Sequence, residues 1–228
     1  MSLLHRQNVR RHLSRHLLCR VEGATDRFAL TFDDGPSPRN TPRLLEVLER
    51  AGARATFFLL DHRARRHPDL VRRLVVAGHE AGVHGRLHLW PLILPTRTLA
   101  WELRRTAQAI EAAAAVRPRL YRAPFGLLRP GQARAVRALG YEPVLGDIYP
   151  ADVECRQAVH IASRVMPRLA AGSIVILHDS TVLGDGDRGP TVEAVATILR
   201  EAAALGLAAA TVSEMIAAAA APDAHGRG

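Results

Sequence analysis

Short apolar runs recur along the chain, separated by longer amphipathic stretches. The runs contain β-branched and aromatic residues and are bounded by turn-forming residues, which is typical of buried strands. The clearest predicted strands are residues 28–32, 55–60 and 173–177, and weaker ones are residues 80–83, 119–121, 142–145 and 207–212.

Between these runs, apolar residues recur at helical spacing. Thr41 is the expected N-cap of the first helix, with Pro42 at its first position, and Ser213 is the expected cap of the last helix. The helices predicted between those two cover residues 68–77, 96–116, 131–139, 157–170 and 191–204.

Seven strands that alternate with helices through short connections indicate a parallel sheet in an α/β protein. The strand count favours a barrel or a strongly twisted open sheet, and 228 residues suit one large domain. We expect a basic N-terminal segment over residues 1–22, the folded domain over residues 23–221, and a loose C-terminal tail over residues 222–228.

Ionisable residues follow nearly every predicted strand. In parallel barrels the active site lies at the carboxyl ends of the strands, so groups far apart in sequence should converge there. In chain order these groups are Asp33, Asp34, Asp61, His62, His84, Arg122, Asp147 or Asp152, His178 and Asp179.

Two carboxylates stand side by side where the first strand gives way to a Gly-Pro-Ser-Pro turn. Asp33 and Asp34 are therefore held by a rigid element but lie at its open end. Adjacent like charges repel one another, so a metal ion or an arginine is their natural companion.

A pair of histidines strengthens this interpretation. His84 and His88 are four residues apart, a spacing that would bring both rings to one face of a helical turn. Two neutral histidines and one carboxylate form a common divalent-metal set that leaves coordination positions open. We identify Asp34 as the candidate carboxylate.

Composition and charge narrow the classes of protein and of binding partner. Hydrophobic residues make up 48% and charged residues 23%, which excludes a largely disordered chain. The net charge of +9, with Arg far outnumbering Lys, suits anionic polymers and leaves open a weak association with an anionic wall or membrane surface. Aromatic residues are only 4% and do not interleave with basic runs, so we expect no nucleic-acid partner.

The N-terminus and the cysteines add little. Cys19 and Cys155 have no CxxC spacing and suggest neither a zinc knuckle nor a disulfide framework. The apolar pieces of residues 1–20 are too short for a signal peptide or a membrane span. We therefore expect the protein to be cytoplasmic by default. We also expect it to be a monomer.

Four ordered blocks resemble the signatures of the polysaccharide deacetylase family (carbohydrate esterase family 4). They are Thr31–Pro36, the pair His84 and His88, Arg122–Gly126, and Leu177–Asp179. The similarity runs from about residue 28 to residue 214. It implies that residues 23–221 form a catalytic domain with a deformed (β/α) barrel. It also implies metal-dependent hydrolysis of an N-acetyl group from an amino sugar.

Carried over to this chain, the resemblance implies that Asp34, His84 and His88 bind a divalent metal, most often zinc in this family. A bound metal lowers the pKa of its water and polarises the amide carbonyl. Asp33 would then be the general base, and His178 the acid that protonates the leaving amine.

Further roles follow from the same blocks. Arg122 would pair with Asp33, although a purely structural ion pair is the alternative. The backbone N–H of Phe125 would donate to the oxyanion, and Leu177 would line the pocket for the acetyl methyl group.

The chain departs from the family pattern at several positions. The family usually has Ser or Thr after the first metal-binding histidine, and here Gly85 follows it. A family block of the form Asp-x-x-Asp-Trp, whose second Asp orients the acid histidine, is also altered. We favour Asp152 as the partner of His178, and keep Asp147, nearer the strand end, as the alternative and as a candidate substrate-binding residue.

The tryptophan of that block is missing, which leaves the sugar unidentified. Val153 stands in its place. Trp90 and Trp101 lie near the histidine pair in sequence and could supply the stacking surface, although a core role suits each equally well.

Three classes of function remain open at this point. The leading one is deacetylation of a polymeric, oligomeric or lipid-linked amino sugar, with deformylation or hydrolysis of another non-peptide amide as variants of the same chemistry. A catalytically degenerate carbohydrate-binding barrel is the second, although such a module gains nothing from a full proton-transfer set. A basic polyanion-binding protein, supported by charge alone, is the third.

Overall fold

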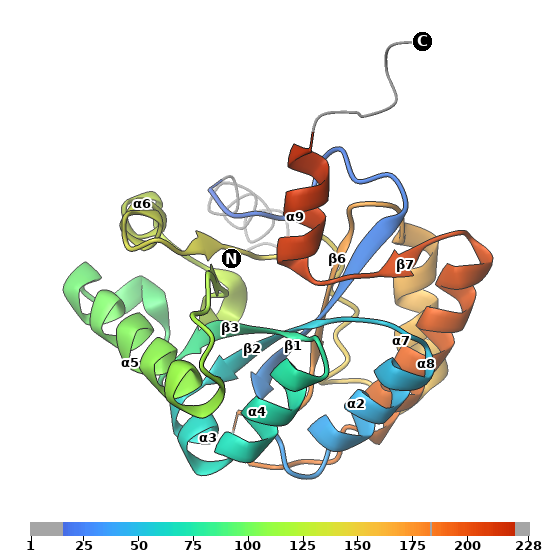
Figure 1. The fold of residues 1–228 in the computed structure, drawn as a ribbon, viewed down its shortest axis with the longest axis horizontal. Helices are drawn as coiled ribbons and strands as arrows, with labels where there is room; N and C mark the ends of the chain where they lie inside the picture. Colours follow the sequence, from blue (N-terminus) through green and yellow to red (C-terminus); the bar gives the residue numbers. More distant parts are fainter. Residues whose placement is uncertain (1–15, 183, 222–228) are drawn as a thin grey trace, which may run out of the picture.

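The fold is an α/β barrel built on one seven-stranded sheet, as predicted. The computed structural model describes residues 16–182 and 184–221. Its paired strands are parallel and follow the order β5-β4-β3-β2-β1-β6, with β7 beside β1 (Figure 1). The strands are β1 (Arg27–Gly35), β2 (Thr56–Leu60), β3 (Glu80–Gly85), β4 (Leu120–Tyr121), β5 (Glu142–Pro143), β6 (Ile174–His178) and β7 (Ala208–Ala209).

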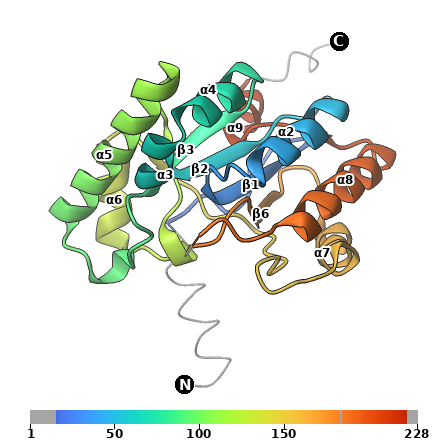
Figure 2. The same cartoon turned by 90° about the horizontal axis from the view of Figure 1, so that it is seen from below.

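Helices cover the outer face of this sheet, as the two ribbon views show (Figures 1 and 2). No helix within the described residues is long and apolar enough to cross a membrane. The α-helices are α2 (Thr41–Arg50), α3 (Asp61–Arg66), α4 (Pro68–Val76), α5 (Thr96–Ala114), α6 (Pro130–Ala138), α7 (Ala158–Val165), α8 (Gly189–Ala204) and α9 (Val212–Ala220), and the 3₁₀ turns are η1 (Pro91–Ile93), η2 (Pro124–Gly126) and η3 (Met166–Arg168).

The barrel closes between β5 and β6 through segments that are not regular strands. Residues 18–21 lie between them and form bridges to Val144 on one side and Ser173 on the other. Ile148 forms a further parallel bridge to Val175 of β6. Part of the predicted N-terminal segment therefore lies within the barrel wall.

Residues 1–15 and 222–228 lie outside the described residues. Leu17 and Val21 are buried and belong to the hydrophobic core.

Alternation along the strands divides the core into two layers. On β1, Phe28, Leu30 and Phe32 pack against the surrounding helices, whereas Ala29 belongs to a smaller cluster inside the barrel. Helix α9 contributes to this inner cluster and contacts the starts of β2 and β3, because the Val212 and Ser213 backbone N–H groups donate to Thr56 and Glu80. The inner cluster contains Val21, Ala29, Phe58, Leu120, Val144, Ile174, Ala210, Val212 and Met215.

The first N-cap prediction is displaced by one residue. Asn40, not Thr41, is the N-cap of α2. The Thr41 hydroxyl instead accepts a hydrogen bond from the Ser37 backbone and donates to the Asp179 carboxylate.

The cap of the last helix is also displaced. Thr211 caps α9 through a reciprocal capping box with Glu214. Ser213 does not cap this helix, because its hydroxyl donates to Glu80 at the start of β3.

The predicted helix over residues 157–170 is shorter than expected. Helix α7 ends at Val165 and continues as the 3₁₀ turn Met166–Arg168. Pro167 lies within this turn, and its lack of a backbone N–H disfavours further α-helix.

We predict that Gly35→Ala destabilises the fold. A Cβ at Gly35 would lie 2.4 Å from Asp179 Oδ2, and that carboxylate is fully buried. Overpacking of this kind costs about 1–3 kcal/mol in free energy of unfolding. Chemical denaturation would measure the loss, with Gly184→Ala as the matched control because a Cβ there meets nothing within 4 Å. Equal stability of the two variants would contradict the prediction.

Candidate metal centre and acid–base site

A cavity of about 880 Å³ opens at the carboxyl ends of the strands. Most of the predicted chemistry lies on its wall, alongside a large apolar surface. The lining residues are Asp33, Asp34, His84, His88, Trp90, Leu92, Arg122, Phe125, Gly126, Leu127, Leu145, Tyr149, Val153, Ile176, His178, Val182 and Arg188.

A backbone irregularity lets two consecutive aspartates reach this cavity. Neighbouring residues on a regular strand point to opposite faces. At Asp34 the backbone has φ of 74°, and the β1–β2 register shifts between Asp33 and Gly35. This β-bulge places both Asp33 and Asp34 on the cavity wall.

Asp34, His84 and His88 converge as a candidate metal centre. Asp34 Oδ1 lies 3.4 Å from His84 Nε2 and 3.4 Å from His88 Nε2. One ligand atom from each residue lies within 4.8 Å of the others. Asp34 Oδ1 is buried and has no hydrogen-bond partner among the described residues. This donor set fits a divalent cation, because such a cation would satisfy that oxygen.

The two histidines do not share a helical turn, contrary to the sequence prediction. His84 lies on β3, and His88 lies in the following loop with φ of 55°. Gly85 has φ of 100°, a conformation that disfavours any residue with a Cβ. The turn at this glycine folds the loop back, so that His88 joins His84.

The ionisation of these ligands suits cation binding. Burial alone would raise the pKa of Asp34, but the neighbouring imidazole of His84, with the charges of His178 and His88, lowers this pKa to about 2. Burial and the charge of His84 lower the pKa of His88. Asp34 is therefore anionic, and the neutral form of His88 is favoured, which are the forms that ligate metals.

A second contact orients His84. Its Nδ1 lies 2.9 Å from the carbonyl oxygen of Arg122, so Nδ1 carries the proton and donates. Nε2 then faces Asp34 and is the ring atom that can ligate a metal.

Arg122 also holds Asp33. Its Nη1 donates to Asp33 Oδ1 over 2.7 Å and to Thr31 Oγ1 over 2.6 Å. The guanidinium is buried and lies 4.2 Å from the centre of the Phe58 ring. These contacts fix Asp33 beside the metal centre.

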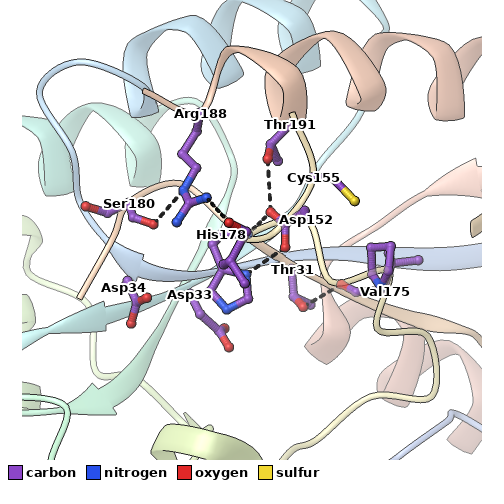
Figure 3. Close-up of polar contacts among 12 residues, drawn as sticks. Thr31, Asp33, Asp34, Asp152, Cys155, Val175, His178, Ser180, Arg188 and Thr191 are labelled. Carbon is purple, nitrogen blue, oxygen red and sulfur yellow. Dashed lines mark hydrogen bonds and ion pairs between the residues drawn. The ribbon is translucent and has the colours of Figure 1, made fainter. Parts of the chain in front are cut away.

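His178 is paired with Asp152, which resolves the two alternatives of the sequence analysis. His178 Nδ1 lies 2.8 Å from Asp152 Oδ1, while Asp152 Oδ2 accepts from the His178 backbone N–H and from Thr191 Oγ1 (Figure 3). Burial lowers the pKa of His178, but the charge of Asp152 and its hydrogen bond raise it to about 9. His178 is therefore protonated at neutral pH.

Asp147 does not lie on the cavity wall. Its carboxylate accepts hydrogen bonds from the Ile174 backbone N–H, the Ser173 hydroxyl and the Arg20 guanidinium. These contacts tie the barrel closure together. The proximity of Asp147 to a strand end in sequence therefore pointed to the wrong aspartate.

Leu177 is likewise not on the cavity wall. It is fully buried among the outer core residues, whereas Ile176 and His178 line the cavity. Side chains alternate along β6, so the residue two before the histidine shares its face. Ile176 takes the position that we assigned to Leu177.

Aromatic residues form one wall next to the metal centre. Phe125 has φ of 61° and packs edge-on against His88, with ring centroids 4.6 Å apart. The ring centroids of Trp90 and Phe125 are 5.7 Å apart, and Trp90 is 51% exposed. Trp101 instead lies near Arg86 and Arg105, away from the lining residues.

Three other strand-end residues have structural contacts outside the cavity lining. Asp61 pairs with Arg65, and His62 contacts the Arg86 carbonyl oxygen. Asp179 is buried against Gly35 and Thr41.

Tyr149, Thr191 and Arg188 also belong to the site, although the sequence pattern did not indicate them. Tyr149 packs edge-on against His178, Thr191 supports Asp152, and Arg188 lines the cavity. Arg188 ends the loop after the His178 strand and Thr191 lies in the first turn of α8, so a search of this loop and helix start would have found both.

The fold and the site together define an α/β barrel whose strand ends carry a candidate metal triad. Residues 20–144 match the model of a family described as polysaccharide deacetylase. The chain is 34% identical to the peptidoglycan-N-acetylglucosamine deacetylase of Bacillus cereus over 190 residues, which cover 82% of this chain and 87% of that protein. This chain therefore belongs to the polysaccharide deacetylase family, whose named members are hydrolases of N-acetylated sugars.

Two further comparisons agree. The chain is 32% identical to a chitooligosaccharide deacetylase of Bradyrhizobium sp., over 68% of this chain and 72% of that protein. Its fold matches a crystal structure of the Bc1960 peptidoglycan N-acetylglucosamine deacetylase with a TM-score of 0.84 at 24% identity, covering 89% of this chain and 93% of that one.

We predict that His84→Ala abolishes tight binding of a divalent cation. Loss of even a supporting residue weakens metal sites by 10–100-fold, so loss of a ligand should raise the Kd by at least about 100-fold. Metal analysis and calorimetry would measure this. His160→Ala, an exposed histidine on α7, should behave like the parent. Unchanged affinity in His84→Ala would disprove the assignment of this ligand.

We predict that Asp152→Asn lowers the pKa of His178. The carboxylate raises that pKa to about 9, so its neutralisation should bring the value down by at least about one unit. NMR titration of the imidazole in chelator-treated protein would report the change. Asp147→Asn is the control, because Asp147 has no contact with His178. Equal pKa values in both variants would show that Asp152 does not govern this histidine.

Proposed function

We propose that this protein hydrolyses the N-acetyl group of an amino sugar in a glycan, with Asp33 as general base and His178 as general acid. The carrying observation is that these two side chains stand on adjacent strands beside one metal-type triad. Asp33 of β1 and His178 of β6 are register partners. Each is held by its own buried partner, Arg122 or Asp152.

Asp34, His84 and His88 would hold the cation. One carboxylate oxygen and two imidazole nitrogens suit zinc, which we propose as the resident metal. When bound, such a cation polarises a carbonyl oxygen and acidifies water.

Asp33 would take the proton of the nucleophile. Arg122 donates to Oδ1, so the position of the carboxylate is fixed while Oδ2 is left free of that contact. A base held in this way needs no reorientation when the nucleophile loses its proton.

His178 is placed to give a proton. Its Nδ1 contacts Asp152, so Nε2 is the atom that faces the substrate. Because its pKa is raised to about 9, the ring carries a proton at neutral pH and can deliver it to the departing sugar nitrogen.

The remaining wall supports an acyl group and a sugar ring. Ile176 and Leu145 line the cavity with apolar surface suited to a methyl group. Trp90 and Phe125 offer aromatic faces for a pyranose, in place of the missing family tryptophan. We propose that the backbone N–H of Phe125 donates to the developing oxyanion.

The retained acid, base, ligands and arginine favour an active enzyme over a degenerate sugar-binding barrel. Acetyl and formyl amides differ in the size of the acyl group, so a panel of N-acetylated and N-formylated oligosaccharides would separate the two chemistries. Release of acetate from the N-acetylated members is the expected result, and release of formate alone would exclude deacetylation.

We predict that Asp33→Asn lowers kcat by about 10²–10⁴-fold, the usual contribution of a positioned base, while the metal content stays at the parental level. The amide keeps the shape of the side chain and removes its basicity. Acetate release and metal analysis would measure both effects. Asp69→Asn, an exposed aspartate on α4, is the control. Parental turnover in Asp33→Asn would refute the assignment of the base.

A further inference from the structure

We propose that Arg188 forms an anion-binding subsite in the catalytic cavity, and that the preferred substrate is an amino sugar bearing a carboxylate or phosphate near its N-acyl group. This inference rests on the proposed function for the identity of the reaction. It concerns a different part of the substrate from the amide.

Arg188 lies at the N-terminal end of the helix that follows the His178 strand. It immediately precedes α8, is only 9% exposed, and shares the cavity wall with His178. In Figure 3 its side chain extends from the start of α8 toward the side of the site that holds His178 and Asp152.

Two backbone carbonyl groups hold the side chain of Arg188, and the Asn40 side chain holds its backbone. Arg188 Nε donates to the Ser180 carbonyl oxygen over 3.0 Å, and Nη1 makes a long contact of 3.4 Å with the Val153 carbonyl oxygen. The Arg188 backbone N–H donates to Asn40 Oδ1. A guanidinium carries five N–H donors, so donors remain beyond these two side-chain contacts.

Within the part of the chain that the structure describes, the charge of Arg188 lacks a carboxylate partner. Among the described residues three arginines are buried, and Arg63 pairs with Asp185 while Arg122 pairs with Asp33. No described carboxylate lies within 4 Å of Arg188. Burial of an uncompensated charge is costly, so the cavity favours a ligand that brings an anion.

The neighbouring aspartate does not fill this role. Asp152 uses one oxygen for the His178 ring and the other for the His178 backbone and Thr191. The guanidinium therefore remains available to a planar carboxylate or a phosphate, groups that it binds through paired hydrogen bonds.

Comparison of matched neutral and acidic substrates tests this subsite. The neutral probe is an N-acetylglucosamine oligosaccharide. The acidic probes are an oligosaccharide of equal length that contains N-acetylmuramic acid, for a carboxylate, and a phosphorylated N-acetylglucosamine oligosaccharide, for a phosphate. The parent should have a kcat/KM at least about tenfold higher for one acidic probe, as expected for a charge-assisted contact.

Arg188→Gln should lower the acidic-to-neutral ratio of kcat/KM at least about tenfold, chiefly through KM. Arg188→Lys should keep part of the preference, because it keeps the charge but not the planar fork. Arg134→Gln, which removes an exposed arginine on α6, should leave the ratio at the parental value. Equal losses on neutral and acidic probes would show that Arg188 only ties the Ser180 and Val153 loops, and would overturn the subsite.

Binding in a non-turnover background separates this inference from the proposed function. In Asp33→Asn protein, calorimetry should show tighter binding of an acidic probe than of the neutral one, and Arg188→Gln should remove the difference. If the parent hydrolysed no probe, the proposed function would fail while this measurement still decided the subsite. Equal binding of all probes to the Asp33→Asn protein would overturn the subsite, even with deacetylation intact.

Discussion

The buried guanidinium of Arg122 connects the core of the barrel to its chemistry. The guanidinium lies over the ring of Phe58 in the inner apolar cluster. Its Nη1 donates to Thr31 and Asp33. The carbonyl oxygen of the same residue accepts a hydrogen bond from His84 Nδ1. One residue thus fixes the candidate base and a candidate metal ligand together, and a charge buried this deeply depends on Asp33 for compensation.

Above that arginine, irregular backbone places the reactive groups. Asp34, His88 and Phe125 all have positive φ values, although none is glycine. Such conformations are disfavoured for residues with a Cβ and persist only where the surroundings hold them. Here the regular strands supply rigidity, and the bulge and turns at their ends supply the directions that a regular strand cannot.

The strands and the barrel fold were easier to predict than the directions of individual side chains. The apolar runs gave seven strands and a barrel, and strand ends marked Asp33, Asp34, His84 and His178, because these features depend on local sequence pattern. Leu177 was predicted to line the cavity, but its side chain points to the opposite face of β6 from its neighbours Ile176 and His178. The caps of α2 and α9 moved because Thr41 and Ser213 form tertiary hydrogen bonds that no local pattern reveals. Arg188 was missed because its significance lies in the absence of a carboxylate partner among the described residues, which is a property of the folded surroundings.

The way the barrel closes has a consequence for how the chain assembles. Residues 18–21 complete the wall by pairing with Val144 and Ser173, which lie more than 120 positions further along the chain. Contacts between such distant segments carry a high entropic cost and form slowly. The β1–β2–β3 half, built from sequential neighbours, can assemble during synthesis, whereas the seam next to β6 must wait until nearly the whole polypeptide has emerged.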